Sequence, residues 1–202
     1  MSWKSFYYPL GSHFLYLEDI LYIEEALKSF PLETVTYGDA GELNNCRVGR
    51  LVEDHPCQSP KVVNKELSEP ILKLFSSTKA RSFYSKYVGE VSDGQVIRRC
   101  QFNLLDTGAF VGRHLDVDSN PDYQIASVLQ LGSSFEGGEF AVYENPNSHI
   151  SEAQVIKPEF GSITISFCKH EHEVLPVSSG VRTSFVAFVS SYGGRNRRTL
   201  SS

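Results

Sequence analysis

Two histidines and one aspartate in this sequence have the residue types and the order of a metal-binding triad. His114 and Asp116 are separated by a single residue, and His172 follows much later in the chain. Two imidazoles and one carboxylate can occupy one face of an octahedral metal and leave the opposite face open, which is the ligand set typical of non-haem Fe(II) sites. Arg182 adds a permanent, forked cation suited to a carboxylate partner. These residues predict an iron centre beside an anion-binding arginine.

The elements that must hold these residues are predicted to be short strands. From Gly94 onward, β-branched or aromatic runs alternate with clusters of Gly, Pro, Asn or Asp. Eight such runs at this spacing predict a mainly β protein, a jelly roll or barrel-like sandwich, with helices bracing it. Side chains alternate between the faces of a strand, so His114 and Asp116 are expected to point together into the barrel. The predicted strands are residues 96–105, 109–114, 124–131, 139–143, 154–156, 162–167, 171–175 and 183–189.

The first half of the chain is predicted to be a scaffold for this barrel. Apolar residues at helical spacing predict one helix over residues 17–30, which Pro31 ends, and a second over residues 65–79. Residues 32–60 are polar and rich in Gly and Pro, which favours short strands and loops. We therefore expect a single domain over residues 1–202, divided into a scaffold and lid (1–95), a β core (96–192) and a flexible tail (193–202). The segments 36–58 and 117–123 are candidate lids over the site.

Composition narrows the classes of function. The chain has 202 residues, 41% of them hydrophobic and 21% charged, as in an ordinary globular domain, and its net charge of −5 argues against a nucleic-acid partner. We expect no membrane span, because no apolar run approaches the roughly 20 residues needed. No secretory signal is visible at the start, and the four cysteines form no CxxC pair. Free thiols are favoured over a Cys46–Cys57 bridge, and the expected location is the cytoplasm.

Four groups of residues occur in an order that points to one protein family. They are Gly108-x5-His114-x-Asp116, Leu131-x3-Phe135-x-Gly137-Gly138-Glu139, Val155-x2-Pro158-x2-Gly161-x5-Phe167, and His172-x-Val174-x-Pro176-Val177-x2-Gly180-x-Arg182-x-Ser184. With these motifs, the stretch from about Arg98 to Tyr192 resembles the Fe(II)/2-oxoglutarate-dependent dioxygenase superfamily, and within it the prolyl-4-hydroxylase-like branch.

The resemblance implies that the jelly roll is a cupin-like double-stranded β-helix, and it implies a role for each of these residues. His114, Asp116 and His172 would be both the catalytic residues and the ligands of Fe(II). The cosubstrate 2-oxoglutarate would chelate the iron, while its distal carboxylate pairs with Arg182 and accepts a hydrogen bond from Ser184. Dioxygen would be the oxidant, succinate and carbon dioxide the coproducts, and ascorbate is a further candidate cofactor. The implied reaction is the hydroxylation of an unactivated C–H bond.

The sequence departs from the family pattern at one position near the cosubstrate. Many relatives carry a Tyr that helps to bind 2-oxoglutarate, and here that position is Leu105. Asn103 or Gln101, on the same strand face, are candidate replacements, and Thr164 is expected to point inward toward the cosubstrate. All of these side chains are equally well explained as ordinary residues of a strand that have no role in binding. His170 shares strand parity with His172, but the Val-x-Pro-Val-x2-Gly-x-Arg register favours His172 as the ligand.

Several functions stay open from the sequence. A small metabolite such as an amino acid is the favoured substrate, because the chain is compact and acidic and has no evident peptide-binding module. A prolyl residue in a protein and a non-catalytic metal- or ligand-binding jelly roll are the alternatives. Halogenation is disfavoured because Asp116 is present, and nucleic-acid demethylation is disfavoured by the Arg position and the acidic composition. Arg98, Arg99, Arg113 and Asp118 are candidates for contact with a charged substrate, and the oligomeric state stays open.

Overall fold

The computed structural model describes residues 5–89, 95–145 and 147–199. Its helices are α1 (Leu17–Leu27), α2 (Lys65–Phe75) and α3 (Thr78–Val88), with short 3-10 turns η1 (Asp116–Asp118) and η2 (Ile150–Glu152). The strands of the first half are β1 (Ser5–Tyr8), β2 (Glu33–Tyr37), β3 (Leu43–Glu53) and β4 (Lys61–Val62). Those of the second half are β5 (Val96–Leu105), β6 (Val111–His114), β7 (Ile125–Leu131), β8 (Phe135–Gly137), β9 (Phe140–Val142), β10 (Gln154–Ile156), β11 (Ile163–Phe167), β12 (His172–Val174), β13 (Val177–Gly180) and β14 (Arg182–Ser190).

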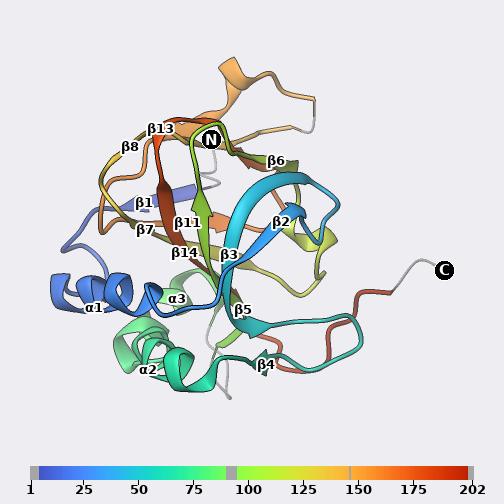
Figure 1. Cartoon of the computed structure of the whole chain (residues 1–202). Coiled ribbons are helices and arrows are strands. Elements are labelled where there is room, and N and C mark those ends of the chain that lie inside the picture. The colour runs from blue at the N-terminus through green and yellow to red at the C-terminus, as the bar shows by residue number, and fades with distance from the viewer. Residues whose placement is uncertain (1–4, 90–94, 146, 200–202) are drawn as a thin grey trace.

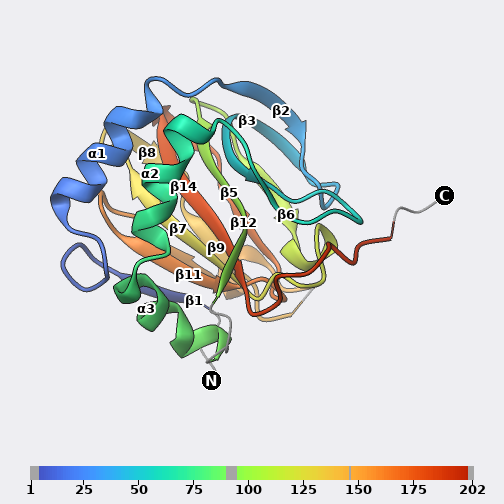
Figure 2. The ribbon, with the colours of Figure 1, turned by 90° about the horizontal axis from the view of Figure 1, so that it is seen from below.

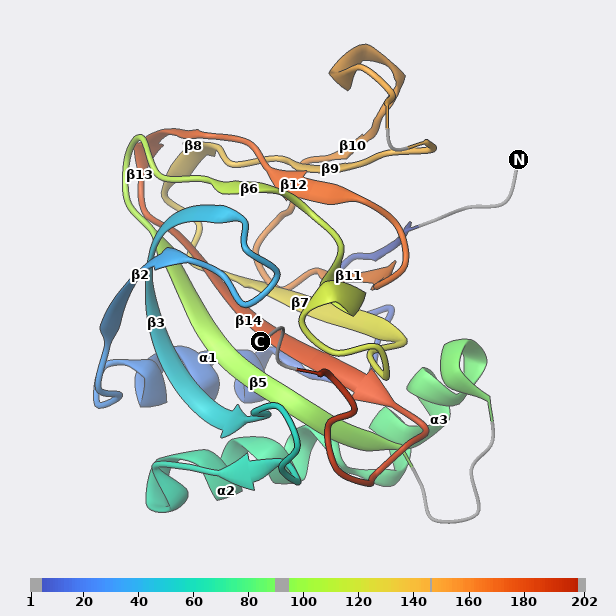
Figure 3. The same ribbon diagram turned by 90° about the vertical axis from the view of Figure 1, so that its right-hand side faces the viewer.

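Most of the strands form one long antiparallel sheet that folds over on itself. Its order is β1-β11-β7-β14-β5-β3-β6-β12-β9-β10, with β2 and β4 each paired to β3, while β8 and β13 form a separate pair. The sheet turns over between β3 and β6, which are joined at a single pair, Asn44 and Val111. Figure 3 shows the result as two layers, with β6, β12, β9 and β10 lying over the broad layer of β3, β5, β14 and β7. This arrangement is the predicted jelly roll.

The main hydrophobic core lies between the broad layer and the helices. Figures 1 and 2 show all three helices on one side of this layer. Every second residue of β5 and β14 faces them, including the fully buried Phe102 and Phe185, which pack with Ile23, Ile71 and Phe75. The other residues of the same strands therefore face inward, toward the space between the two layers. The helices thus leave the inner face of the sheet free to line a site.

The helices differ from the prediction in number. Instead of one helix over residues 65–79, the chain forms α2 and α3 with a break at Ser76 and Ser77. The Ser77 hydroxyl accepts a hydrogen bond from the Ala80 amide at 3.2 Å, so Ser77 is the N-cap of a new helix. The Ser76 hydroxyl donates to the Leu72 carbonyl at 2.7 Å at the end of α2. α1 also ends at Leu27, three residues before the predicted boundary at Phe30.

The eight predicted strands are all present, with bounds that match or differ by at most two residues. The first half contains the main omission. Residues 32–60 were expected to form short strands and loops, yet β3 is eleven residues long and pairs with β2, β4, β5 and β6. β3 is therefore an interior strand of the sheet.

A buried ion pair fixes the end of the chain to the sheet. Arg98 and Asp54 have fully buried side chains, and Arg98 Nε donates to Asp54 Oδ2 at 2.9 Å. Asn120 Nδ2 donates to the same carboxylate at 2.7 Å, and Asn196 Nδ2 donates to the Asp54 carbonyl at 3.2 Å. Arg197 also pairs with Asp122. The flexible tail that we expected from residue 193 is thus held to the body around Asn196.

Two further expectations concern the cysteines and the membrane. All four cysteines are free thiols, so the alternative Cys46–Cys57 bridge is absent, as favoured from the sequence. Among the residues that the structure describes, no helix is both long and apolar enough to cross a membrane.

Candidate metal and cosubstrate site

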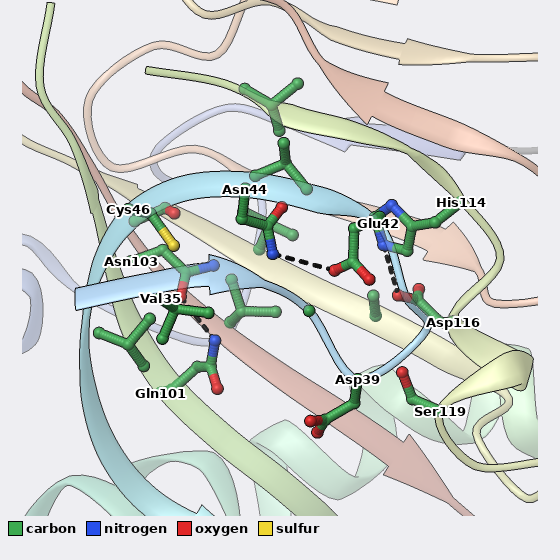
Figure 4. Close-up of a pocket in the computed structure, with 18 of the residues that line it drawn as sticks. Val35, Asp39, Glu42, Asn44, Cys46, Gln101, Asn103, His114, Asp116 and Ser119 are labelled. Atoms are coloured by element: carbon green, nitrogen blue, oxygen red, sulfur yellow. Dashed lines mark hydrogen bonds and ion pairs between the residues drawn. The ribbon is translucent and has the colours of Figure 1, made fainter. Parts of the chain in front are cut away.

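The three predicted metal ligands meet between the two layers of the sheet. His114 ends β6, Asp116 begins the turn that follows, and His172 begins β12 as the cross-strand partner of His114. One ligand atom from each residue lies within 4.8 Å of the others. Asp116 is 4% exposed and His172 is 6% exposed, so the cluster is shielded from solvent. Figure 4 shows His114 and Asp116 next to each other on one side of the pocket, with a dashed line joining them.

Hydrogen bonds to the backbone set the tautomer of both histidines. His114 Nδ1 lies 2.7 Å from the Gly112 carbonyl, and His172 Nδ1 lies 2.9 Å from the His170 carbonyl. A carbonyl only accepts, so each Nδ1 must carry a proton, and Nε2 is the ring atom of each histidine that can bind a metal. Both Nε2 atoms point toward Asp116, at 3.3 Å for His114 and 3.5 Å for His172. Because His172 is the residue that pairs with His114, it is the ligand of the triad. His170 contributes only the backbone carbonyl that orients the His172 ring to this arrangement.

Charge in this cluster favours a bound cation. Burial by itself would raise the pKa of Asp116, but the nearby His172 and His114 hold it well below its usual range. Burial would lower the pKa of His114, but the hydrogen bond and charge of Asp116 raise it to about 9. Asp116 Oδ2 is also buried and has no hydrogen-bond partner. An anionic oxygen without a partner between two imidazole nitrogens fits a divalent metal with this donor set.

Inward-facing residues of β3, β5 and β14 line the pocket beyond the triad. They stand in cross-strand rows: Leu105 opposite Arg182, then Asn103 between Val48 and Ser184, then Gln101 between Arg50 and Val186. The opposite wall carries Phe140 and Val174 beside His172. Each of these rows therefore combines polar and apolar side chains.

The end of the pocket at Arg182 is a site for an anion. Arg182 is 3% exposed, and burial lowers its pKa to about 10 in spite of the charge of Glu139. It forms no ion pair with any residue in the described ranges. Arg182 Nε and the Ser184 hydroxyl are both buried and lack hydrogen-bond partners. A buried guanidinium and hydroxyl left open on one strand face fit a carboxylate ligand.

The other residues that we predicted near the cosubstrate include Leu105, Asn103 and Thr164, and the structure places each of them differently. Leu105 is fully buried in a small apolar cluster directly opposite Arg182, so no hydroxyl stands where relatives have a Tyr. Asn103 lines the pocket, and its Oδ1 accepts from Gln101 Nε2 at 2.6 Å, which leaves its NH2 group as the donor for a ligand. Thr164 is buried in β11 opposite Val128 but does not line the pocket. A role for Asn103 or Thr164 in binding stays a prediction.

Of the four charged residues that were candidates for substrate contact, only Arg99 lines the pocket. There it pairs with Asp39, and its Nε donates to Gln101 at 3.0 Å. Arg98 is instead the structural partner of Asp54, and Arg113 pairs with Glu171 outside the pocket. Asp118 is exposed and does not line the pocket.

Sequence reasoning missed two pocket residues that lie on the β2–β3 hairpin. Glu42 and Asn44 line the pocket close to His114 (Figure 4). They lie within the segment 36–58 that was singled out as a lid, but nothing in the local pattern marks them individually. The available signal is alternation along β3, where Asn44, Cys46, Val48 and Arg50 share one face.

This fold and this site define an iron-dependent oxygenase of the jelly-roll class. Residues 100–190 match the 2OG-Fe(II) oxygenase superfamily. A Burkholderia pseudomallei oxidoreductase of the 2OG-Fe(II) oxygenase family is 34% identical, with a TM-score of 0.85 over 96% of this chain and 89% of that chain. The chain therefore belongs to the 2OG-Fe(II) oxygenase family, and Fe(II) and 2-oxoglutarate are its implied cofactors.

More distant solved structures share the fold. A Pseudomonas putida prolyl-4-hydroxylase is 17% identical, with a TM-score of 0.60 over 94% of each chain. A Trichoplax adhaerens prolyl hydroxylase, solved with a hypoxia inducible factor peptide fragment, is 16% identical, with a TM-score of 0.63 over 93% of this chain and 84% of that chain. The search of curated proteins found no match.

Proposed function

We propose that this oxygenase hydroxylates an unactivated C–H bond of a small metabolite such as an amino acid, and that it converts 2-oxoglutarate to succinate and carbon dioxide in the same turnover. The observation that carries the cosubstrate part is the open pair of buried donors, Arg182 Nε and the Ser184 hydroxyl. A jelly roll that only bound metal would have no use for a desolvated guanidinium without a partner. These donors argue against the non-catalytic alternative.

Within this function, the chain's residues divide the work. His114, Asp116 and His172 hold the iron, which supplies the oxidising chemistry when it is bound. Arg182 and Ser184 bind the distal carboxylate of 2-oxoglutarate and so fix its orientation relative to the triad. The inward side chains of β3 and β5, with the β2–β3 hairpin, enclose the substrate and exclude bulk water.

The small-metabolite proposal is supported by how the pocket is enclosed. The β2–β3 hairpin and β3 bring Asp39, Glu42, Asn44 and Arg50 against the pocket, so its lining is polar and charged. Such a lining suits a compact polar molecule. The free thiols, Cys46 and Cys57 among them, also support our proposal that the protein works in a reducing compartment such as the cytoplasm.

The first experiment tests the iron and cosubstrate site. Under anaerobic conditions, the purified protein with Fe(II) and 2-oxoglutarate is expected to show a weak visible charge-transfer band. His172→Ala is expected to abolish this band, because it removes one of three metal ligands. His170→Ala is the matched control and should keep the band, since His170 does not line the pocket and the variant keeps the backbone carbonyl that orients His172. Absence of the band from the unaltered protein would overturn the proposal.

The second experiment seeks the substrate. Succinate release is measured with amino acids, other small metabolites and proline-rich peptides, and each stimulating compound is checked by mass spectrometry for the gain of one oxygen atom. A small metabolite is expected to stimulate release most strongly. Preference for a peptide would replace this proposal with the alternative of a prolyl hydroxylase.

A further inference from the structure

The turn of the β2–β3 hairpin places a carboxylate inside the pocket. The Gly38 amide donates to the Glu42 carbonyl at 2.9 Å, and the Gly41 amide donates to the Gly38 carbonyl at 3.0 Å. Gly41 has φ of +85°, a conformation that glycine adopts without strain. The Glu42 side chain folds back over Gly38, where an added Cβ would overlap its carboxylate. The turn thus needs a glycine at position 38 for Glu42 to point inward.

The Glu42 carboxylate is only half satisfied. Asn44 Nδ2 donates to Glu42 Oε1 at 3.1 Å, while Glu42 Oε2 is buried without a hydrogen-bond partner. No cationic side chain of the described residues forms an ion pair with Glu42. The nearby Arg99 is already bonded to Asp39 and Gln101. The Glu42 carboxylate therefore faces the pocket with one buried oxygen unbonded and with no ion-pair partner among the described residues.

Asn44 supplies a second, independent acceptor. Its side chain is 7% exposed, and its Oδ1 is buried without a hydrogen-bond partner. Because Asn44 Nδ2 is bound to Glu42, the free atom of this amide can only accept. Two buried acceptors that lack donors thus stand side by side on the pocket wall.

The position of this acceptor pair relates it to the iron site. Figure 4 shows the Glu42 carboxylate between the Asn44 amide and the pair of His114 and Asp116. All four of these side chains line the same pocket. A group bound to Glu42 and Asn44 therefore lies beside the metal ligands.

We propose that the substrate carries an amine or guanidine cation, and that Glu42 and Asn44 bind this group next to the iron. The inference rests on the proposed function, and it adds the charge of the substrate. An ammonium or guanidinium group offers several N–H donors and one positive charge, so a single group satisfies Glu42 Oε2 and Asn44 Oδ1 and neutralises the buried charge. The C–H bond that is oxidised accordingly lies within a few bonds of the cationic nitrogen.

The charge of the substrate is testable before its identity is known. A metabolite extract, freed of macromolecules, is passed over a strong cation exchanger in its acid form, which retains amines and guanidines and passes neutral compounds and organic acids. Both fractions are added to the protein with Fe(II) and 2-oxoglutarate, and succinate release is measured. Stimulation by the retained fraction is expected. Stimulation by the unretained fraction alone would overturn the inference and leave the proposed function standing. If neither fraction stimulates release, both are overturned.

Variants then assign the effect to Glu42. With the active fraction as probe, Glu42→Gln is expected to raise the amount needed for half-maximal stimulation at least about tenfold, the factor that corresponds to about 1.4 kcal/mol. The anaerobic charge-transfer band and the KM for 2-oxoglutarate should not change. Gly38→Ala is expected to act in the same direction, because its methyl group displaces the carboxylate without removing it. Glu53→Gln, at the far end of β3 and outside the pocket, is the matched control.

A structural role for Glu42 predicts a different result. If the carboxylate only stabilised the hairpin, Glu42→Gln would lower the melting temperature and the stimulation by cationic and neutral probes alike. 4-Guanidinobutanoate and 4-ureidobutanoate, which differ in the charge of one group and carry no other amine, serve as defined probes for this comparison. Equal responses of the variant and the unaltered protein to the retained fraction would overturn the assignment to Glu42.

Discussion

At the scale of single residues, the site is built from groups that the protein leaves without partners. Arg182 Nε, the Ser184 hydroxyl, Asp116 Oδ2 and Glu42 Oε2 are all buried and unbonded among the described residues. Leaving such a group unpaired typically costs about 1–3 kcal/mol, and more for a charged group. The fold bears this cost at four points that face one pocket. Ligands that supply the missing partners should therefore also stabilise the folded protein.

The guanidinium at the pocket end should dominate binding of 2-oxoglutarate. Arg182→Ala is expected to raise the KM for 2-oxoglutarate by about thirtyfold or more, since truncating one partner of a buried charge pair typically costs about 2–5 kcal/mol. Ser184→Ala should have a smaller effect, up to about tenfold, because a neutral hydrogen bond contributes about 0.5–1.5 kcal/mol. Steady-state kinetics measures both values. Thr183→Ala, on the opposite face of β14, is the control, and an unchanged KM for Arg182→Ala would place the anion site elsewhere.

The residues of the site differ in how far the sequence reveals them. His114, Asp116, His172 and Arg182 are predictable, because an Fe(II) centre with a carboxylate cosubstrate calls for these residue types. Their spacing also places them on or next to three predicted strands, which became β6, β12 and β14. Glu42 is not, because its inward orientation depends on a turn and on the empty space above Gly38. Acidic residues in polar loops are common, and spacing along the chain carries no sign of which one a hairpin turns inward.

At the scale of elements, a strand could be predicted from the sequence where one of its faces is clearly apolar and the other is not. β5 and β14 were predicted because one face packs on the helices with large apolar side chains. β3 was expected to be broken because its inward face lines a polar pocket, so Asn44 and Arg50 interrupt the usual alternation. The break between α2 and α3 was not predicted either. The residues on both sides of Ser77 favour helix, and one N-cap serine within such a stretch does not mark a boundary by itself.

The buried pair of Arg98 and Asp54 should contribute strongly to the docking of these elements. It joins β5 to the end of β3, and its neighbours Asn120 and Asn196 extend it to the turn after β6 and the C-terminal segment. Arg98→Met is expected to lower the free energy of unfolding by about 3–5 kcal/mol, because it leaves the Asp54 carboxylate buried without its cation. Urea denaturation measures this change.

A surface pair provides the control for that measurement. Arg47 also forms two hydrogen bonds to one aspartate, Asp106, but both side chains are well exposed. Arg47→Met should therefore cost no more than about 1 kcal/mol. The double variant Arg98→Met with Asp54→Leu should regain much of the stability, since no buried charge is then left alone. If Arg98→Met and Arg47→Met lowered the free energy of unfolding equally, burial would not strengthen the contribution of the Arg98–Asp54 pair to stability.

At the scale of the whole molecule, the site depends on parts of the chain that the family motifs do not cover. The matched stretch, residues 100–190, contains the triad and Arg182. However, β3 from the first half lies between β5 and β6 and supplies Asn44, Cys46, Val48 and Arg50 to the pocket. The three helices that cover the broad layer also come from the first half. That residues 1–202 form a single domain stays a prediction from the sequence.

A fragment of residues 96–202 should therefore fail to form the site although it keeps every predicted ligand. Without β3, the facing edges of β5 and β6 lose their partner strand, and without the helices Phe102, Leu129 and Phe185 are exposed to water. At about 25 cal/mol per Å² of apolar surface, the loss of this core exceeds the usual net stability of about 5–15 kcal/mol. We expect the fragment to show no cooperative thermal transition and no charge-transfer band with Fe(II) and 2-oxoglutarate, where the full chain shows both. A folded fragment that binds iron would instead make the first half a separate module, and the pocket contacts of β3 would then serve the substrate alone.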